Sequence, residues 1–289
     1  METAVTVGNF DGVHLGHVHL LSRLKEEARR RNLKPVVVTF DPHPAEVLRP
    51  PDRRFCRLST AEEKAEVLKS LGVEPVVLPF TEEFAGLRPE EFLKEYLLRR
   101  LGARLLVLGY DWRFGKNAAG DFNLAKEFCQ SFGCEVVRVG PYRVGGKTVS
   151  SSLVRDLLRR ARLKEASLYL GRPYWIRRKP VKGKGLGRRL GFPTINFGRV
   201  EGLCLPDGVY AVSIDGLPAV ANLGTAPTLK GERRTLEVHV LETPFEVSDR
   251  PRIVFKRFLR EERVFKTAED LVEQIAADAE LARQVHRTD

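Results

Sequence analysis

Sulfur-containing residues are scarce in this chain, with four cysteines and one methionine among 289 residues. The cysteines form no CxxC pair, which argues against a zinc site of that type, and their scatter predicts reduced thiols rather than a disulfide framework. No apolar run approaches the length of a transmembrane helix. Glu2 and Asn9 interrupt the N-terminus, so it lacks the pattern of a signal peptide. We therefore expect a cytoplasmic protein that does not enter a membrane.

The formal net charge of +11 suits nucleic acid, an anionic membrane or phosphorylated small molecules as partners. One dense basic stretch runs from Arg172 to Arg189, with eight basic residues and no acid. Its only aromatic residues are Tyr174 and Trp175, so the aromatic ladder that stacks single-stranded bases is missing. We expect small-molecule substrates and no nucleic acid; a basic nucleic-acid-binding protein is the remote alternative. Nothing in these patterns indicates the oligomeric state.

Strand-like and helix-like patterns alternate in the first half of the chain. Helical patterns begin near Thr60, Pro89 and Asp121. The apolar runs between the helical patterns cover residues 4–7, 35–40, 73–79, 104–109 and 134–139. This alternation predicts an open parallel α/β sheet, whose ligands bind outside the carboxyl ends of the strands.

The sequence pattern changes after Gly171. Short β-type runs separated by Gly, Pro and Asp turns predict a small antiparallel β-barrel, and a helix from about Ala268 to Gln284 closes the chain. The expected fold class is therefore α/β followed by β. The expected domains are residues 1–158, a helical linker over 159–170 and a second domain over 171–289.

The most informative segment is VGNFDGVHLGH, which follows the first expected strand. His14 and His17 lie three residues apart at the start of an expected helix, so both rings would share one face beside the positive end of the helix dipole. Gly8 and Gly12 permit a close approach of the backbone to a ligand. The segment predicts a nucleotide phosphate site. The alternative is a turn with two solvated histidines.

Two further segments follow strands of the first half. TFDPHP presents His43 between two prolines, or is only a rigid turn. GYDWRFG contains Asp111, Trp112 and Phe114, which would line a pocket for a base or a flavin ring. Alternatively, Trp112 and Phe114 belong to the core and Asp111 forms a surface pair with Arg113.

Helix starts and Gly-rich turns offer further phosphate contacts. The segment SSSLVR, which contains Ser151, is typical of a helix start, because serine is a common N-cap residue. Arg155 adds a positive charge to the first turn of that helix. In the second half, GKGLGRRLGFPTIN combines glycines that bring backbone N–H groups close to phosphates with the oxygens of Thr194 and Asn196, which suit Mg²⁺. Glu237, in the strand LEVHV, is a candidate general base or an ordinary solvated strand residue.

Taken together and in this order, these segments resemble the bifunctional bacterial riboflavin kinase/FMN adenylyltransferase (FAD synthetase) family over nearly the whole chain. The segments of the first half look like its Rossmann-like, HxGH-type nucleotidyltransferase domain. LGFPTIN, NLGTAPT, LEVHV and FLREERVF look like its β-barrel kinase domain. HxGH is shared by many nucleotidyltransferases, whereas the kinase motifs are far more specific.

The resemblance implies two reactions that use ATP and Mg²⁺: phosphorylation of riboflavin to FMN, and adenylylation of FMN to FAD with release of pyrophosphate. His14 and His17 would stabilise charge in the second reaction, and Glu237 would accept the hydroxyl proton in the first. In the first domain, the resemblance implies that ATP is contacted by Gly8, Asn9, Phe10, Asp11, Gly16, Ser151 and Arg155, and that the flavin or the base is contacted by His43, Asp111, Trp112 and Phe114. In the second domain, it implies that MgATP is held by Gly183, Gly185, Gly187, Thr194 and Asn196, and that the flavin is held by Arg260 and Phe265.

Two departures from the family pattern lie in the second half. Arg178 stands where the family usually has a glycine, and Val247–Pro251 replaces a usual Tyr-Gly. They motivate the alternative of an FMN adenylyltransferase with an impaired kinase barrel. Because Thr194, Asn196 and Glu237 are present, we predict an active kinase.

Overall fold

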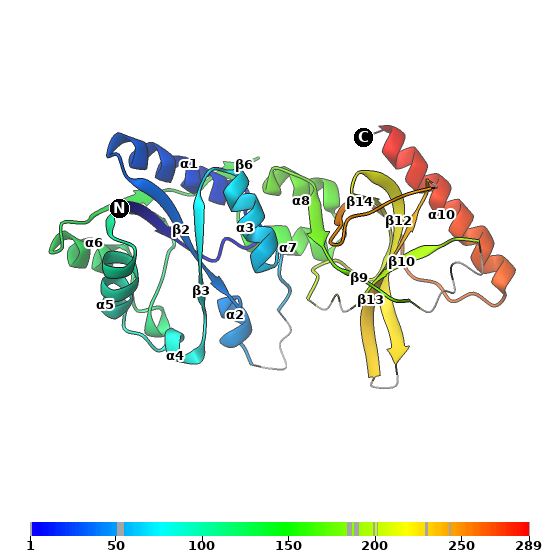
Figure 1. The fold of residues 1–289 in the computed structure, drawn as a ribbon, viewed down its shortest axis with the longest axis horizontal. Coiled ribbons are helices and arrows are strands. Elements are labelled where there is room, and N and C mark those ends of the chain that lie inside the picture. The colour runs from blue at the N-terminus through cyan, green and yellow to red at the C-terminus, as the bar shows by residue number, and fades with distance from the viewer. Residues whose placement is uncertain are drawn as a thin grey trace. The chain divides into compact units, whose positions relative to one another are not determined.

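The computed structural model describes residues 2–50, 55–183, 187, 191–198, 200, 202–228, 231–242 and 244–288. The chain divides into two compact units, Met1–Ser151 and Ser152–Asp289 (Figure 1). Among the residues just given, none of the helices is both long and apolar enough to cross a membrane.

The first unit is built on a five-stranded parallel sheet with the order β3-β2-β1-β4-β5. Its strands are β1 (Thr3–Val7), β2 (Lys34–Asp41), β3 (Glu74–Pro79), β4 (Ala103–Gly109) and β5 (Glu135–Val139). The strand order reverses between β1 and β4, which makes the carboxyl end of β1 the topological switch point. The expected α/β class is confirmed, and the HxGH segment lies at that switch point.

Helices cover both faces of this sheet. Successive strand residues point to opposite faces, and apolar residues occur on both, so each face has to be buried. On one face α1 (Leu15–Arg30) and α3 (Ala61–Ser70) pack Leu21, Leu24 and Leu68 against the strands. The other face is covered by α5 (Pro89–Glu91) with its π-helical continuation (Phe92–Arg100) and by α6 (Phe122–Gln130). The shorter elements of the unit are α2 (Pro44–Val47), α4 (Glu82–Ala85), a 3₁₀ turn (Lys116–Ala118) and the hairpin β6 (Arg143–Val144) and β7 (Lys147–Thr148).

The expected helix starts are confirmed by their caps. Thr60 and Glu63 form a reciprocal capping box at α3, with hydrogen bonds of 2.7 and 3.2 Å. Asp121 caps α6 by accepting the N–H of Leu124 at 3.0 Å. Both helices therefore begin where local side-chain chemistry sets them.

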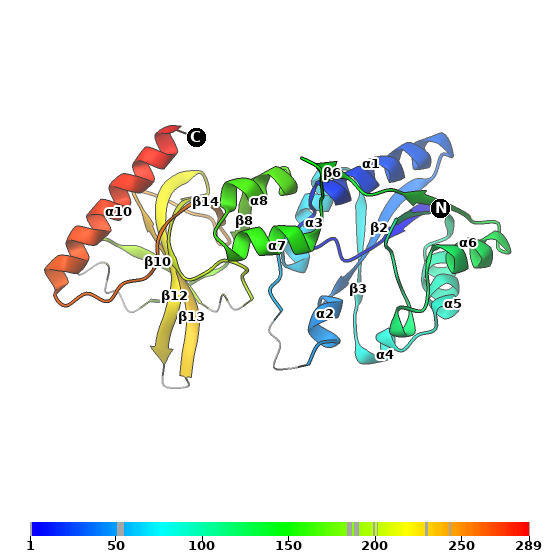
Figure 2. The same ribbon diagram turned by 180° about the vertical axis from the view of Figure 1, so that it is seen from behind.

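The second unit contains a curled, seven-stranded antiparallel sheet with the order β8-β14-β11-β12-β13-β10-β9. The strands are β8 (Tyr174–Arg177), β9 (Pro180–Val181), β10 (Thr194–Phe197), β11 (Gly208–Ile214), β12 (Leu217–Thr228), β13 (Gly231–Val240) and β14 (Arg252–Arg260). The helix α10 (Ala268–Thr288) packs along one side and buries Ala279, Ala282 and Val285 against β11 and β12 (Figure 2). This agrees with the expected barrel and terminal helix.

The helical stretch expected from Ser152 to Leu170 is divided into two helices, α7 (Ser151–Arg159) and α8 (Leu163–Leu170). Ala161 between them has φ +53°, a left-handed conformation that breaks the helix. The helix α8 packs against β8 and β14.

The thiols follow the sequence prediction only in part. Cys129 and Cys134 are free and buried, as expected for reduced thiols. For Cys56 and Cys204 the prediction is wrong, because both are disulfide-bonded.

Gly12 and Gly72 form a matched pair for testing the loop after β1. Both have positive φ, +77° and +74°, but a Cβ at Gly12 would lie 2.8 Å from the Leu58 side chain, whereas one at Gly72 meets nothing within 4 Å. We expect Gly72→Ala to cost about 1 kcal/mol of unfolding free energy through backbone strain, and Gly12→Ala to cost more than about 2 kcal/mol because a steric overlap is added.

The measurement is urea unfolding followed by Trp112 fluorescence in a Trp175→Phe background, which leaves Trp112 as the only tryptophan. Equal losses in the two variants would contradict the predicted steric contribution of Leu58.

Candidate active sites

His14 and His17 are placed by the N-terminus of α1. His14 is the N-cap residue, and its Nδ1 accepts the backbone N–H of His17 at 3.3 Å. The two rings stack with centroids 3.6 Å apart and planes 13° apart. The rings therefore do share one face at the helix start, where the dipole favours an anion.

The contact of His14 Nδ1 with the His17 N–H bears on its tautomer. In a neutral ring, an Nδ1 that accepts a hydrogen bond leaves the proton on Nε2. Gly16 makes this packing possible, since a Cβ there would lie 3.1 Å from the His14 ring and 3.0 Å from the Val149 carbonyl oxygen. A larger residue at Gly16 would therefore require the His14 ring or the Val149 carbonyl to shift by a few tenths of an ångström.

The loop between β1 and α1 is held from inside by Asp11. This side chain is 2% exposed, and its carboxylate accepts the N–H groups of Leu58 at 3.0 Å and Ser59 at 3.1 Å. Phe10 and Val13 have positive φ, +47° and +41°, an uncommon conformation for these residue types. Asp11 therefore acts as an anchor for a strained loop, while its expected contact with ATP stays a prediction.

Other residues of the loop are also engaged within the protein. The N–H of Gly8 donates to the Val38 carbonyl at 3.1 Å, and the Phe10 side chain is fully buried. Asn9 is exposed, and its carbonyl accepts the Thr39 hydroxyl at 3.0 Å. For Gly8 and Phe10 the structure thus supports a role in shaping the loop.

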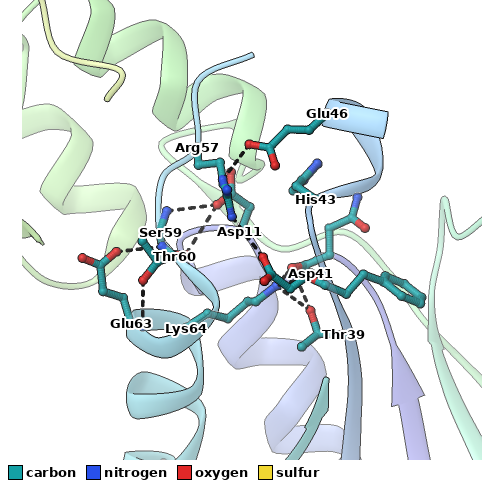
Figure 3. A network of polar contacts seen from close by, with 12 residues as sticks. Asp11, Thr39, Asp41, His43, Glu46, Arg57, Ser59, Thr60, Glu63 and Lys64 are labelled. Carbon is teal, nitrogen blue, oxygen red and sulfur yellow. Dashed lines mark hydrogen bonds and ion pairs between the residues drawn. The ribbon is translucent and has the colours of Figure 1, made fainter. Parts of the chain in front are cut away.

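A polar network at the carboxyl ends of β1 and β2 was missed by the sequence analysis (Figure 3). The buried Lys64 lies at its centre, and Arg57 pairs with Asp41 at 3.0 Å and with Glu46 at 2.6 Å. His43 is 7% exposed and caps α2 by accepting the Ala45 N–H at 3.0 Å. The signal for Lys64 was available, because a lysine four residues before Leu68 lies on the buried face of the helix.

The GYDWRFG segment divides between surface and core. Phe114 is 7% exposed and packs in the core near Phe92, so the core alternative is correct for this residue. Trp112 is half-buried and stacks on Phe114 with centroids 4.0 Å apart, and Asp111 is exposed. A ligand role in this segment therefore rests on Asp111 and Trp112.

Ser151 joins the HxGH loop to the start of α7. Its hydroxyl donates to the Asp11 carbonyl at 3.0 Å. Arg155 is half-buried and lies one helical turn further along α7. Their expected roles at the ATP phosphates stay predictions.

In the second unit, five neighbouring strands each place one residue in a single cross-sheet row. Asn196 pairs with Glu237, Glu237 with Asn222, Asn222 with Val209, and Val209 with Arg260. Directly opposed residues project from the same face of a sheet. All five line one cavity of about 490 Å³, which is large enough for a small organic substrate.

The next row of the ladder lines the same cavity. Thr194 pairs with His239, whose Nδ1 lies 2.9 Å from the Pro193 carbonyl oxygen. The Asn196 amide donates to the Thr194 hydroxyl at 3.4 Å, so the two residues expected at MgATP are adjacent. The other residues around this cavity are Gly187, Phe192, Val220, Glu262, Arg263, Phe265, Leu271, Ile275 and Asp278.

The glycines of the basic turn lie against these polar side chains. A Cβ at Gly183 would lie 2.3 Å from Asn196 Nδ2, and one at Gly187 would lie 2.4 Å from the Phe192 carbonyl oxygen. They are thus required for close approach to the Thr194–Asn196 edge. Gly185 lies outside the described residues.

Arg260 is fixed by α10. Its Nε and Nη2 donate to the Asp278 carboxylate at 3.0 and 2.7 Å, and Asp278 is 2% exposed. Such bidentate pairs define the orientation of the guanidinium. Phe265 lies with its ring centroid 5.9 Å from the Arg260 guanidinium carbon. Asp278 was missed by sequence because its partner comes from a different element.

The two departures from the family pattern are accommodated locally. Ser248 donates through its N–H and hydroxyl to Asp215 at 2.9 and 2.8 Å, at the end of β11 opposite to Val209. Arg178 donates to the Arg177 carbonyl at 2.6 Å. The cavity wall is formed by other residues.

Comparison with known proteins agrees with both units. The FAD synthetase family profile matches residues 1–153, and the riboflavin kinase profile matches residues 170–286. A crystal structure from Streptococcus pneumoniae, described as a macrolide-efflux protein, superposes with a TM-score of 0.83 at 31% identity, covering 98% of this chain and 94% of that chain.

Curated relatives match over almost their whole length. The bifunctional riboflavin kinase/FMN adenylyltransferase of Escherichia coli K12 is 38% identical, covering 97% of this chain and 91% of that protein. The protein of the same name from Pseudomonas fluorescens is 36% identical, with coverage of 96% and 91%. The chain therefore belongs to the bifunctional riboflavin kinase/FMN adenylyltransferase family.

Proposed function

We propose that the chain phosphorylates riboflavin to FMN in the second unit and adenylylates FMN to FAD in the first, using ATP in both reactions. The observation that carries the kinase assignment is the row from Asn196 to Arg260, which places an acid, two amides and a guanidinium on one cavity wall. The adenylyltransferase assignment rests on the stacked histidines at the N-terminus of α1.

In the kinase reaction, the 5′-hydroxyl oxygen of riboflavin attacks the γ-phosphorus of ATP, the bond to the bridging oxygen breaks, and ADP leaves. Glu237 is exposed to the cavity and would accept the hydroxyl proton as general base. Arg260, oriented by Asp278, would hold the flavin together with Phe265. The protein thereby contributes mainly orientation and one proton transfer.

The donor set around Thr194 suits Mg²⁺. The Thr194 hydroxyl accepts the Asn196 amide N–H, so the two side chains are adjacent, and each carries an oxygen of the kind that Mg²⁺ prefers as a ligand. Thr194 and Asn196 would hold the ion with the ATP phosphates. When bound, the ion neutralises phosphate charge.

In the adenylyl transfer, a phosphate oxygen of FMN attacks the α-phosphorus of ATP and pyrophosphate leaves. The Nε2–H of His14 and the ring of His17 would donate to the phosphate oxygens on which negative charge increases. Ser151 and Arg155 would contact the phosphates from α7, and Asp111, Trp112 and His43 would contact the flavin or the base. No covalent enzyme intermediate is needed.

The domain boundaries and cellular setting follow as part of the proposal. We assign the adenylyltransferase to residues 1–158, the connection to 159–170 and the kinase to 171–289, in the cytoplasm. We infer that the described part of the basic stretch serves phosphorylated ligands; in support, the Trp175 ring on which a base could stack already lies 4.4 and 5.9 Å from the guanidinium carbons of Arg252 and Arg177.

Incubation of the protein with riboflavin, ATP and Mg²⁺ should yield FAD, separated from the other flavins by chromatography. FMN as the only product would contradict the adenylyltransferase assignment. If no flavin is converted, FMN should replace riboflavin: FAD formed from FMN alone would support the alternative of an impaired kinase barrel.

Reciprocal variants should separate the two reactions. We expect His17→Ala to lower FMN adenylylation by roughly 10²- to 10³-fold, the loss typical of one donor at a transition-state oxyanion, and to leave riboflavin phosphorylation within twofold. Glu237→Gln should lower riboflavin phosphorylation by roughly 10²- to 10⁴-fold, because a general base is removed, and spare adenylylation.

Matched controls are His19→Ala on the same helix and Glu242→Gln just beyond β13, both exposed positions. Steady-state rates with riboflavin and with FMN give the comparison. Joint loss of both activities in a folded single variant would argue against two separate sites.

A further inference from the structure

Lys64, in the second turn of α3, is a charged residue that the proposed reactions do not use. Its side chain is 4% exposed. The ammonium donates to the Thr39 hydroxyl at 2.8 Å, to the Asn9 carbonyl at 3.0 Å and to the Phe40 carbonyl at 3.1 Å (Figure 3). A lysine has three N–H donors, so its hydrogen-bonding capacity is filled inside the protein.

The three acceptors belong to the loop after β1 and to the end of β2. Asn9 lies in the loop that leads from β1 to the stacked histidines, and Thr39 and Phe40 are among the last residues of β2, directly before the loop that carries His43. Thr39 also donates to the Asn9 carbonyl at 3.0 Å. The ammonium thus ties the loop after β1 to the end of β2, which leads into the loop of His43, at the carboxyl edge of the sheet, where ligands bind in this architecture.

The helix that carries Lys64 is itself fixed to the first of these loops. The Asp11 carboxylate accepts the N–H groups of Leu58 and Ser59, just before α3, and the Gly12 N–H donates to the Ser59 hydroxyl at 3.0 Å. The capping box of Thr60 then sets the first turn of α3. Movement of the ammonium is therefore transmitted directly to the loop.

Burial disfavours the charged form of Lys64. It lowers the pKa of Lys64 to about 8; the carboxylates of Asp11, Asp41 and Glu46 oppose that lowering, and Arg57 adds to it. A buried charge is weak evidence for a stabilising role, because an apolar residue of similar size often serves stability as well. Stability alone thus gives no reason for the charge, whereas its three acceptors suggest a role in fixing the loop after β1.

We propose that Lys64 is a positioning residue of the adenylyltransferase, whose ammonium holds the loop of His14 and His17 at a fixed distance from the loop of His43. This inference rests on the proposed FMN adenylyltransferase activity. Transfer requires the FMN phosphate, the α-phosphorus and the pyrophosphate oxygen to lie in line, and a displacement of about 1 Å can cost about 10²-fold in rate. Lys64 acts on this alignment through backbone carbonyls, without touching substrate.

The first test replaces Lys64 by methionine, which keeps the length of the side chain and removes its charge. The matched control is Lys69→Met, an exposed lysine on the same helix. With FMN and ATP as substrates, we expect Lys64→Met to lower kcat between tenfold and a hundredfold with KM for FMN within threefold, and Lys69→Met to stay within twofold of the wild type. Circular dichroism and the thermal transition of the first unit establish that the variants are folded.

The second test is the pH profile of kcat/KM for the wild type, which reports groups of the free enzyme. Above pH 8 the ammonium loses its proton, so kcat/KM for adenylylation should fall about tenfold per pH unit towards pH 9.5. Lys64→Arg should remain active to higher pH, since a guanidinium keeps its charge there. Lys64→Met should show no alkaline fall of this kind.

The outcomes distinguish the two proposals. If the wild type forms no FAD from FMN, the proposed activity itself fails. If it forms FAD but folded Lys64→Met retains wild-type kcat, the positioning role is wrong. Should Lys64→Met not fold, a wild-type kcat/KM that is flat to pH 9.5 overturns the inference, and a fall near pH 8 that Lys64→Arg shifts upward supports it.

Discussion

The first unit depends on one buried carboxylate. Asp11 accepts backbone N–H groups from Leu58 and Ser59, and in doing so holds a loop in which Phe10 and Val13 adopt positive φ. Each such residue costs of order 1–3 kcal/mol and persists only where the surrounding structure enforces it. Together with the contacts of Gly8, Asn9 and Gly12, Asp11 keeps the N-terminus of α1 and its histidines at the switch point of the sheet.

The second unit places its cavity residues mainly through backbone pairing, with Asp278 of α10 orienting Arg260. Its cavity wall is set by the antiparallel register, which aligns Asn196, Glu237, Asn222, Val209 and Arg260 across five strands. A slip of one residue in any of these strands would turn its side chain to the opposite face. The hydrogen-bond ladder of the second unit and the Asp11 contacts of the first therefore have the same effect, because both determine the positions of the candidate site residues.

Sequence patterns predicted the elements better than the contacts between them. Apolar periodicity and capping residues such as Thr60 and Asp121 gave the strands and helix starts, because these depend on neighbours in the chain. The partners Lys64 and Asp278 escaped, since their acceptors and donors come from distant segments. Phe114 was ambiguous for the same reason: an aromatic after a strand suits either a pocket or the core until its surroundings are known.

The two sites also differ in how they could be moved to another protein. The turn that carries His14 and His17 in the first unit is one continuous stretch from β1 into α1, with a short support from the residues before α3. The row in the second unit has no such local unit, because each of its members comes from a different strand. A protein engineer could attempt to graft the first as a loop, but would have to transplant an entire curled sheet to obtain the second.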